Sequence, residues 1–147
     1  MIAVVSVAVA VGAWFRPVAD PKVDLADSAP TYTDRQISDA KSALCDAHQL
    51  ANRATHTVAA RKSDDAVVTY IVATNVRLSA TASAEYMLQK LSDHPASPVE
   101  LSGAIRALAV AYQRITLLHL ADAADAELDV AYNELDTTDA RVVRACE

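Results

Sequence analysis

Glycine scarcity is the feature that most limits the fold of this chain. Only Gly12 and Gly103 occur in 147 residues. Tight β-hairpins depend on Asn-Gly, Asp-Gly or similar turns, because their central residues adopt positive φ angles. The sequence lacks such pairs, whereas alanine, the best helix former, is its most abundant residue. The sequence therefore predicts an all-α protein.

The chain begins with an uncharged apolar stretch, residues 1–15, which reads MIAVVSVAVAVGAWF. A membrane-spanning helix needs about 20 apolar residues, whereas a run of about 10–14 is typical of a signal-peptide core. A signal peptide also has a basic segment before its core and a small-x-small cleavage site, and neither fits well here. We interpret residues 1–15 as the end of a retained single-pass membrane anchor whose true start lies further upstream. A cleaved signal peptide and a buried element of a soluble domain are the alternatives.

Residues 16–32 separate this stretch from the rest of the chain. They contain three prolines, Pro17, Pro21 and Pro30, and no apolar period. Proline removes a backbone donor and disfavours helix at the preceding residue. We expect an extended spacer between the membrane and a folded domain that covers residues 33–147.

Four apolar periods within residues 33–147 predict four helices. Thr33 and Gln36 form a capping box, and Ser97-Pro98-Val99-Glu100 predicts a second, with Ser97 as N-cap and Pro98 at the first helical position. Ser63-Asp64-Asp65 supplies a turn and N-cap between them. The helices should span about 34–61, 65–91, 98–120 and 125–146. Short links make consecutive helices antiparallel, so we expect an up-down-up-down four-helix bundle.

The apolar residues predict how the helices pack. The first helix carries a heptad stripe that should face a partner helix. The second helix has a broad apolar band, which predicts contact with two neighbours, although a strand is the alternative at residues 67–72. The heptad stripe comprises Ile37, Ala40, Leu44, Ala47, Ala51, Ala54 and Val58; the band includes Val67, Val68, Ile71, Val72, Val76, Leu78, Ala80, Ala84, Met87, Leu88 and Leu91.

The charge distribution limits the possible partners. The formal net charge is −6, and the lysines and arginines are scattered singly or in pairs. Phosphate binding needs a basic patch, so nucleic acid is not an expected partner. An acidic domain is also not attracted to an anionic lipid surface. Membrane attachment should therefore come from residues 1–15.

Cys45 and Cys146 are the only two cysteines. In an up-down-up-down bundle, the start of the first helix and the end of the fourth lie at the same pole, so the two thiols can meet. An even cysteine count outside the cytoplasm favours pairing. We predict a Cys45–Cys146 disulfide; two unrelated thiols are the alternative.

The polar residues give no pattern typical of catalysis or cofactor binding. The histidines lack the His-x-x-x-His or His-Glu-x-x-His spacing of metal sites, and we interpret them as polar neighbours of a core. Asp122, Asp125 and Asp129 share one helical face, but carboxylates are common near helix N-termini. Neither a Gly-x-Ser-x-Gly nor a Ser-x-x-Lys motif marks a nucleophile. We predict no enzymatic activity, no cofactor and no metal. The histidines are His48, His56, His94 and His119.

The chain resembles a group of mycobacterial and related actinobacterial alanine-rich, single-pass membrane proteins of unknown function. The resemblance rests on the leader and spacer, on the cysteine near the end of the sequence, and on four segments. Such proteins have a basic tail before the membrane helix, which this chain lacks. The resemblance implies no activity, cofactor or site residue. The segments are TYTDRQISDAKSALC, VATNVRLSA, AEYMLQKL and LSDHPASPVELSGAIRALAVAYQ.

An anchor, a spacer and a bundle together suggest a function. The leading hypothesis is a non-enzymatic helical domain, anchored in the cell membrane through residues 1–15 and facing outward, that acts through contacts with another protein of the cell envelope. The alternative is an exported carrier that binds an apolar ligand or lipid within the alanine-lined bundle.

Overall fold

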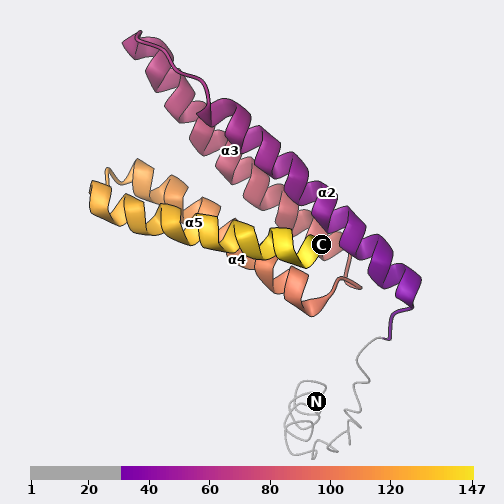
Figure 1. Ribbon diagram of the computed structural model, residues 1–147. Coiled ribbons are helices and arrows are strands. Elements are labelled where there is room, and N and C mark those ends of the chain that lie inside the picture. The colour runs from indigo at the N-terminus through magenta and orange to yellow at the C-terminus, as the bar shows by residue number, and fades with distance from the viewer. Residues whose placement is uncertain (1–30) are drawn as a thin grey trace, which may run out of the picture. The chain divides into compact units, whose positions relative to one another are not determined.

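The computed structural model of the chain describes residues 31–147. The predicted anchor (1–15) and nearly all of the predicted spacer (16–32) lie outside the described residues. The described part is helical, without a strand, and none of its helices has the length and apolarity needed to cross a membrane. Its helices are α2 (Asp34–Ala59), α3 (Ala66–Asp93), α4 (Val99–Leu120) and α5 (Asp125–Cys146) (Figure 1).

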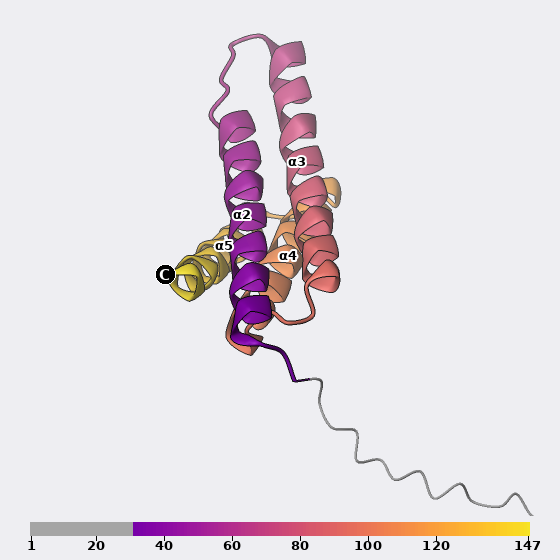
Figure 2. The same cartoon turned by 90° about the vertical axis from the view of Figure 1, so that its right-hand side faces the viewer.

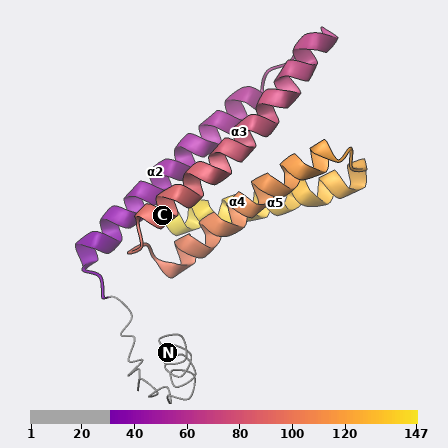
Figure 3. The ribbon, with the colours of Figure 1, turned by 180° about the vertical axis from the view of Figure 1, so that it is seen from behind.

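The four helices form two antiparallel hairpins, α2–α3 and α4–α5. Helix α3 packs against α4, and α2 meets α5 over a shorter stretch. Figure 2 shows α2 and α3 side by side, with α4 and α5 crossing them at an angle. In Figures 1 and 3, the two hairpins separate from each other toward one end. The α2–α3 loop and the α4–α5 turn lie at that end. The predicted all-α bundle of four helices is confirmed, and it is splayed at one end.

The first two helices begin at the residues that their caps predict. Thr33 Oγ1 accepts a hydrogen bond from the backbone N–H of Gln36, while Gln36 Oε1 accepts one from the backbone N–H of Thr33 at 2.9 Å. This reciprocal pair satisfies donors that the first helical turn leaves free. Asp65 caps α3, because its Oδ1 accepts from the N–H groups of Val67 at 2.8 Å and Val68 at 3.0 Å. Residues 67–72 are helical, so the strand alternative is wrong.

The start of α4 differs from the prediction. Pro98, not Ser97, occupies the N-cap position, and no side chain caps the helix. The Ser97 hydroxyl instead lies 2.7 Å from the Ser102 hydroxyl, which also donates to the Pro98 carbonyl at 2.9 Å. Because this contact engages Ser97, the predicted capping box with Glu100 does not form.

The core lies where the two hairpins meet. Alanines on α2 and α3, such as Ala47 and Ala84, are buried and allow the helix backbones to approach closely. Tight packing of large aliphatic side chains fills the space between them and the α4–α5 hairpin. The largest fully buried side chains are Leu44, Met87, Leu101, Ile105, Leu108 and Val142.

The apolar faces of α2 and α3 are covered over only part of their length. Ile37 and Ala54, both members of the predicted heptad stripe, are exposed. The band on α3 contacts two neighbours from Ala80 onward, as predicted, but Val67 and Ile71 are exposed. The reason is the divergence of the hairpins: α4 and α5 cross α2 and α3 at an angle, so the first turns of α3 extend beyond the α4–α5 hairpin (Figure 1).

Gly103 lies in the first turns of α4, where replacement is expected to stabilise the protein. It is exposed, and a Cβ added there would meet nothing within 4 Å. Glycine gives the unfolded chain more conformational entropy than alanine does, so Gly103→Ala should raise the free energy of unfolding by about 0.5–1 kcal/mol. Urea unfolding followed by circular dichroism measures this change. An unchanged or lower midpoint would contradict the expectation.

Candidate functional site

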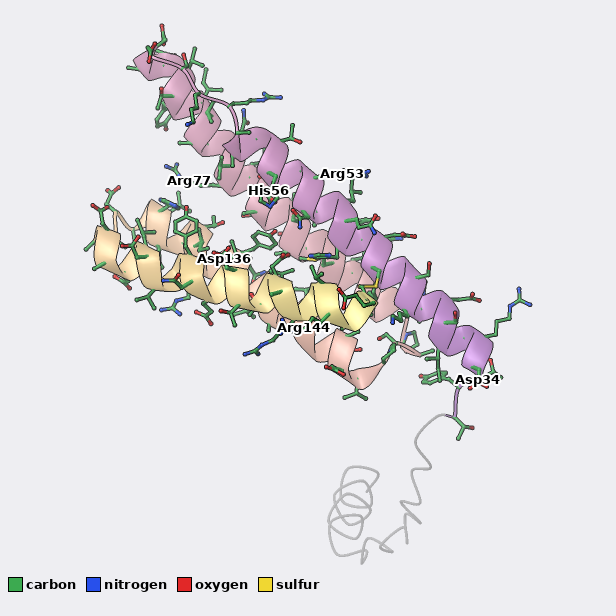
Figure 4. All side chains as sticks on the ribbon, viewed as in Figure 1. Asp34, Arg53, His56, Arg77, Asp136 and Arg144 are labelled. Atoms are coloured by element: carbon green, nitrogen blue, oxygen red, sulfur yellow. A yellow bond between two sulfur atoms is a disulfide. The ribbon has the colours of Figure 1, made fainter. Side chains whose placement is uncertain are left out.

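A cleft opens where the two hairpins diverge, and we call it the interhelical cleft. Its volume is about 270 Å³, and all four helices contribute to its walls. Figure 4 shows His56 on α2 and Asp136 on α5 at the facing sides of this opening. The lining residues are Thr55, His56, Ala59, Val76, Ala80, Tyr112, Ile115, Tyr132, Leu135, Asp136 and Asp139.

The inner wall of the cleft is apolar. Ala80 and Ile115 are buried, and Leu135 is half-buried beside them. Ala59 and Val76 continue this surface toward the open end. The α3 residues that line the cleft are small, so they do not fill the space that opens as α5 moves away. The splay of the hairpins thus leaves an apolar slot, open on one side to solvent.

A hydrogen bond joins α2 to α5 at the closed end of the cleft. His48 Nε2 lies 2.6 Å from Asp139 Oδ1, and because a carboxylate can only accept, the imidazole N–H donates. His48 is 5% exposed, whereas the Asp139 side chain is 30% exposed and reaches the cleft. This bond satisfies a buried ring nitrogen and holds the Asp139 carboxylate in place.

Two tyrosines form part of the cleft walls. The Tyr112 hydroxyl lies 3.4 Å from Thr55 Oγ1, and Tyr132 Oη lies 2.8 Å from His119 Nε2. Burial raises the pKa of Tyr112 above its ordinary value of 10.0, the nearby negative charge of Asp139 also raises it, and the Thr55 hydrogen bond acts in the opposite direction. Burial likewise raises the pKa of Tyr132.

The raised pKa of Tyr112 predicts a loss of stability in alkali. Below about pH 10 the hydroxyl is protonated in both the folded and unfolded states, so its contribution to the free energy of unfolding is fully present. Above that pH the unfolded chain releases the proton first, and the free energy of unfolding falls until pH exceeds the folded-state pKa. Urea unfolding at about pH 9 and about pH 11 tests this. The fall should be smaller in Tyr112→Phe, and an equal fall would contradict the assignment.

The predicted disulfide is present. Cys45 and Cys146 are bonded, with their Cα atoms 5.8 Å apart, and link α2 to the last residue of α5.

Next to the disulfide lies a second, wider depression of about 560 Å³ between the same two helices. Polar side chains of α2 line much of it, including Gln49, Asn52 and Arg53.

The other residues singled out in the sequence are dispersed. His94 ends α3, and Asp122, in the α4–α5 turn, has a φ of 48°. Asp125 lies in the first turn of α5 and Asp129 one turn later, both exposed. Among residues 31–147, no group of three or more His, Cys, Asp or Glu side chains is placed to hold a metal ion.

The sequence did not single out Tyr112, Asp136 or Asp139 as site residues. His48 and Asp139 are 91 positions apart, so no local motif contains both. The available signal was the register of α5, where Asp136 and Asp139 flank the apolar stripe that includes Leu135.

Comparison with protein-family models, with curated proteins and with solved structures finds no match to this chain.

Proposed function

We propose that this protein is a non-enzymatic helical domain, anchored in the cell membrane and facing outward, that acts through contacts with another protein of the cell envelope. The observation that carries the proposal is an exposed stripe on α3, which we call the outer stripe: Val67, Ile71, Thr74 and Leu78. Val67 is 67% exposed, Ile71 50% and Leu78 64%. Large apolar side chains gathered on one exposed face typically mark an interaction site.

The spacing within the outer stripe suits a partner helix. Its members follow one another at intervals of four, three and four residues, which is the spacing of a coiled-coil seam. The core-facing residues of α3, such as Ala84 and Met87, lie on the opposite face of the helix. At least half of each apolar residue in the stripe is exposed, so the stripe can receive a helix from outside.

The proposed location rests on the sequence and on the disulfide. Residues 1–15 are apolar and uncharged, and a proline-containing spacer separates them from α2. Disulfides persist in oxidising compartments and are rare in the cytoplasm, so the Cys45–Cys146 bond supports an outward-facing domain. The suggested resemblance to actinobacterial membrane proteins is consistent with this location and stays a prediction.

Site-specific crosslinking in cells that express the full chain tests the proposal. A photoreactive residue at Ile71 should form an adduct with the same protein in repeated experiments. The matched control carries the same photoreactive residue at Leu117, an apolar position of α4 that is 65% exposed. The double substitution Val67→Ser and Ile71→Ser should abolish association with that partner. It should leave thermal unfolding nearly unchanged, because both side chains are exposed. Equal adducts at the two positions, or none at Ile71, would contradict the proposal.

The second candidate function is that of a carrier for an apolar ligand, and the interhelical cleft favours it. The cleft has an apolar inner wall and opens at the diverging ends of the hairpins. Its volume of about 270 Å³ lies just below the range of about 300–1,000 Å³ that is typical of ligand sites, so it suits a small ligand. Native mass spectrometry of the full chain, released from membranes under mild conditions, should reveal a bound molecule. Repeated preparations without one would count against a carrier.

A further inference from the structure

Two of the polar residues that line the interhelical cleft are carboxylates. Asp136 and Asp139 lie three positions apart on α5, one helical turn, and both reach the cleft. Asp139 is already hydrogen-bonded to His48, whereas Asp136 is exposed and forms no ion pair with any residue in 31–147. His56 faces them from α2 (Figure 4), and the lining residues include neither a lysine nor an arginine. With histidine taken as neutral, the lining residues therefore carry a formal charge of −2, from Asp136 and Asp139.

Aromatic rings stand next to these carboxylates. Tyr112 from α4 and Tyr132 from α5 line the same cleft. The face of an aromatic ring carries partial negative charge and attracts organic cations, most strongly where water is partly excluded. Carboxylate and tyrosine together are a combination that recognises substituted ammonium groups, since the charge is matched and the methyl groups contact the rings.

We propose that the interhelical cleft binds an amphipathic organic cation, a substituted ammonium group with an alkyl tail. The ammonium group lies by Asp136 and the tyrosine rings, and the tail lies on Ala80, Ile115 and Leu135. Asp139 strengthens the negative potential from deeper in the cleft. An amphipathic anion would meet two carboxylates in a partly desolvated site, and this disfavours its binding.

This inference rests on the carrier function and specifies its ligand class. It is independent of the outer stripe, which lies on the face of α3 that points away from the core. A neutral apolar ligand would satisfy the carrier function without satisfying the inference. The experiment must therefore separate the contribution of the charge to binding from that of the apolar tail.

Titration calorimetry of the full chain in amphipol with three probes of equal tail length makes this separation. The probes are hexyltrimethylammonium, hexanol and hexyl sulfate. Hexyltrimethylammonium should bind at least about tenfold more tightly than either of the others, because only its charge is matched by the carboxylates and attracted by the tyrosine rings. Equal binding of all three overturns the inference and leaves the carrier function standing. Binding of none overturns both.

Substitution of one carboxylate locates the site. Asp136→Asn should weaken hexyltrimethylammonium binding about tenfold and leave hexanol binding unchanged, since only the charge is removed. Glu127→Gln is the matched control, because it changes the net charge equally on an exposed residue of α5 that does not line the cleft. Thermal unfolding should be the same in both variants. An equal effect of the two substitutions, or none at Asp136, contradicts the assignment.

Discussion

Loss of the Cys45–Cys146 disulfide is expected to lower the free energy of unfolding by about 3–5 kcal/mol. The two cysteines are 101 positions apart, so the bond closes a long loop in the unfolded chain. A closed loop has far fewer unfolded conformations, and this restriction raises the free energy of the unfolded state. The bond also holds the end of α5 to α2, which otherwise meet over a short stretch.

Comparison of the native protein with a double variant, Cys45→Ser and Cys146→Ser, measures this effect. Urea unfolding should show a lower midpoint in the variant, and a reducing agent should shift the native protein in the same direction. The reducing agent should leave the variant unchanged, which controls for its other effects. Alkylation of the protein from intact cells should label neither cysteine without prior reduction. Native unfolding that is insensitive to reduction would contradict the predicted contribution.

Truncation of Leu108 should have an effect of similar size, about 2–5 kcal/mol for Leu108→Ala. Leu108 lies in the middle of α4 and is 0% exposed, within the cluster that joins both hairpins. The substitution removes the transfer free energy of the lost methyl groups and leaves a cavity that close-packed neighbours fill only in part. The free energy of unfolding falls for both reasons.

Leu117→Ala is the matched control for Leu108→Ala. It makes the same chemical change in the same helix at a side chain that is 65% exposed. Helix propensity changes equally in the two variants, so their difference isolates burial. The control should change the free energy of unfolding by about 0.5 kcal/mol or less. Similar losses in the two variants would show that Leu108 does not lie in a packed core.

Local signals in the sequence predict the four helices well. The Thr33 capping box and the Asp65 cap act over three residues, so they can be recognised without knowledge of the fold. The α4–α5 boundary is weaker because Asp122, rather than a glycine, adopts the positive φ of the turn. At α4, the prediction of Ser97 as N-cap was wrong, because Ser102 forms a competing hydrogen bond with the same hydroxyl.

The splay of the hairpins, and with it the interhelical cleft, could not be predicted from the apolar pattern. Val67 and Met87 belong to the same apolar band in the sequence, yet one is 67% exposed and the other 0%. Periodicity identifies a face that can be buried, but the angle at which the two hairpins cross decides how much of it is buried. The pairing of His48 with Asp139 depends on the same tertiary arrangement.

The position of the disulfide has a consequence for cleavage of the chain. The three connections between the helices of residues 31–147, at 60–65, 94–98 and 121–124, all lie between Cys45 and Cys146. A protease that cuts any one of them leaves two fragments that stay covalently joined. The nicked protein therefore keeps its full mass until it is reduced, and the two halves of its core are held together after the backbone is broken.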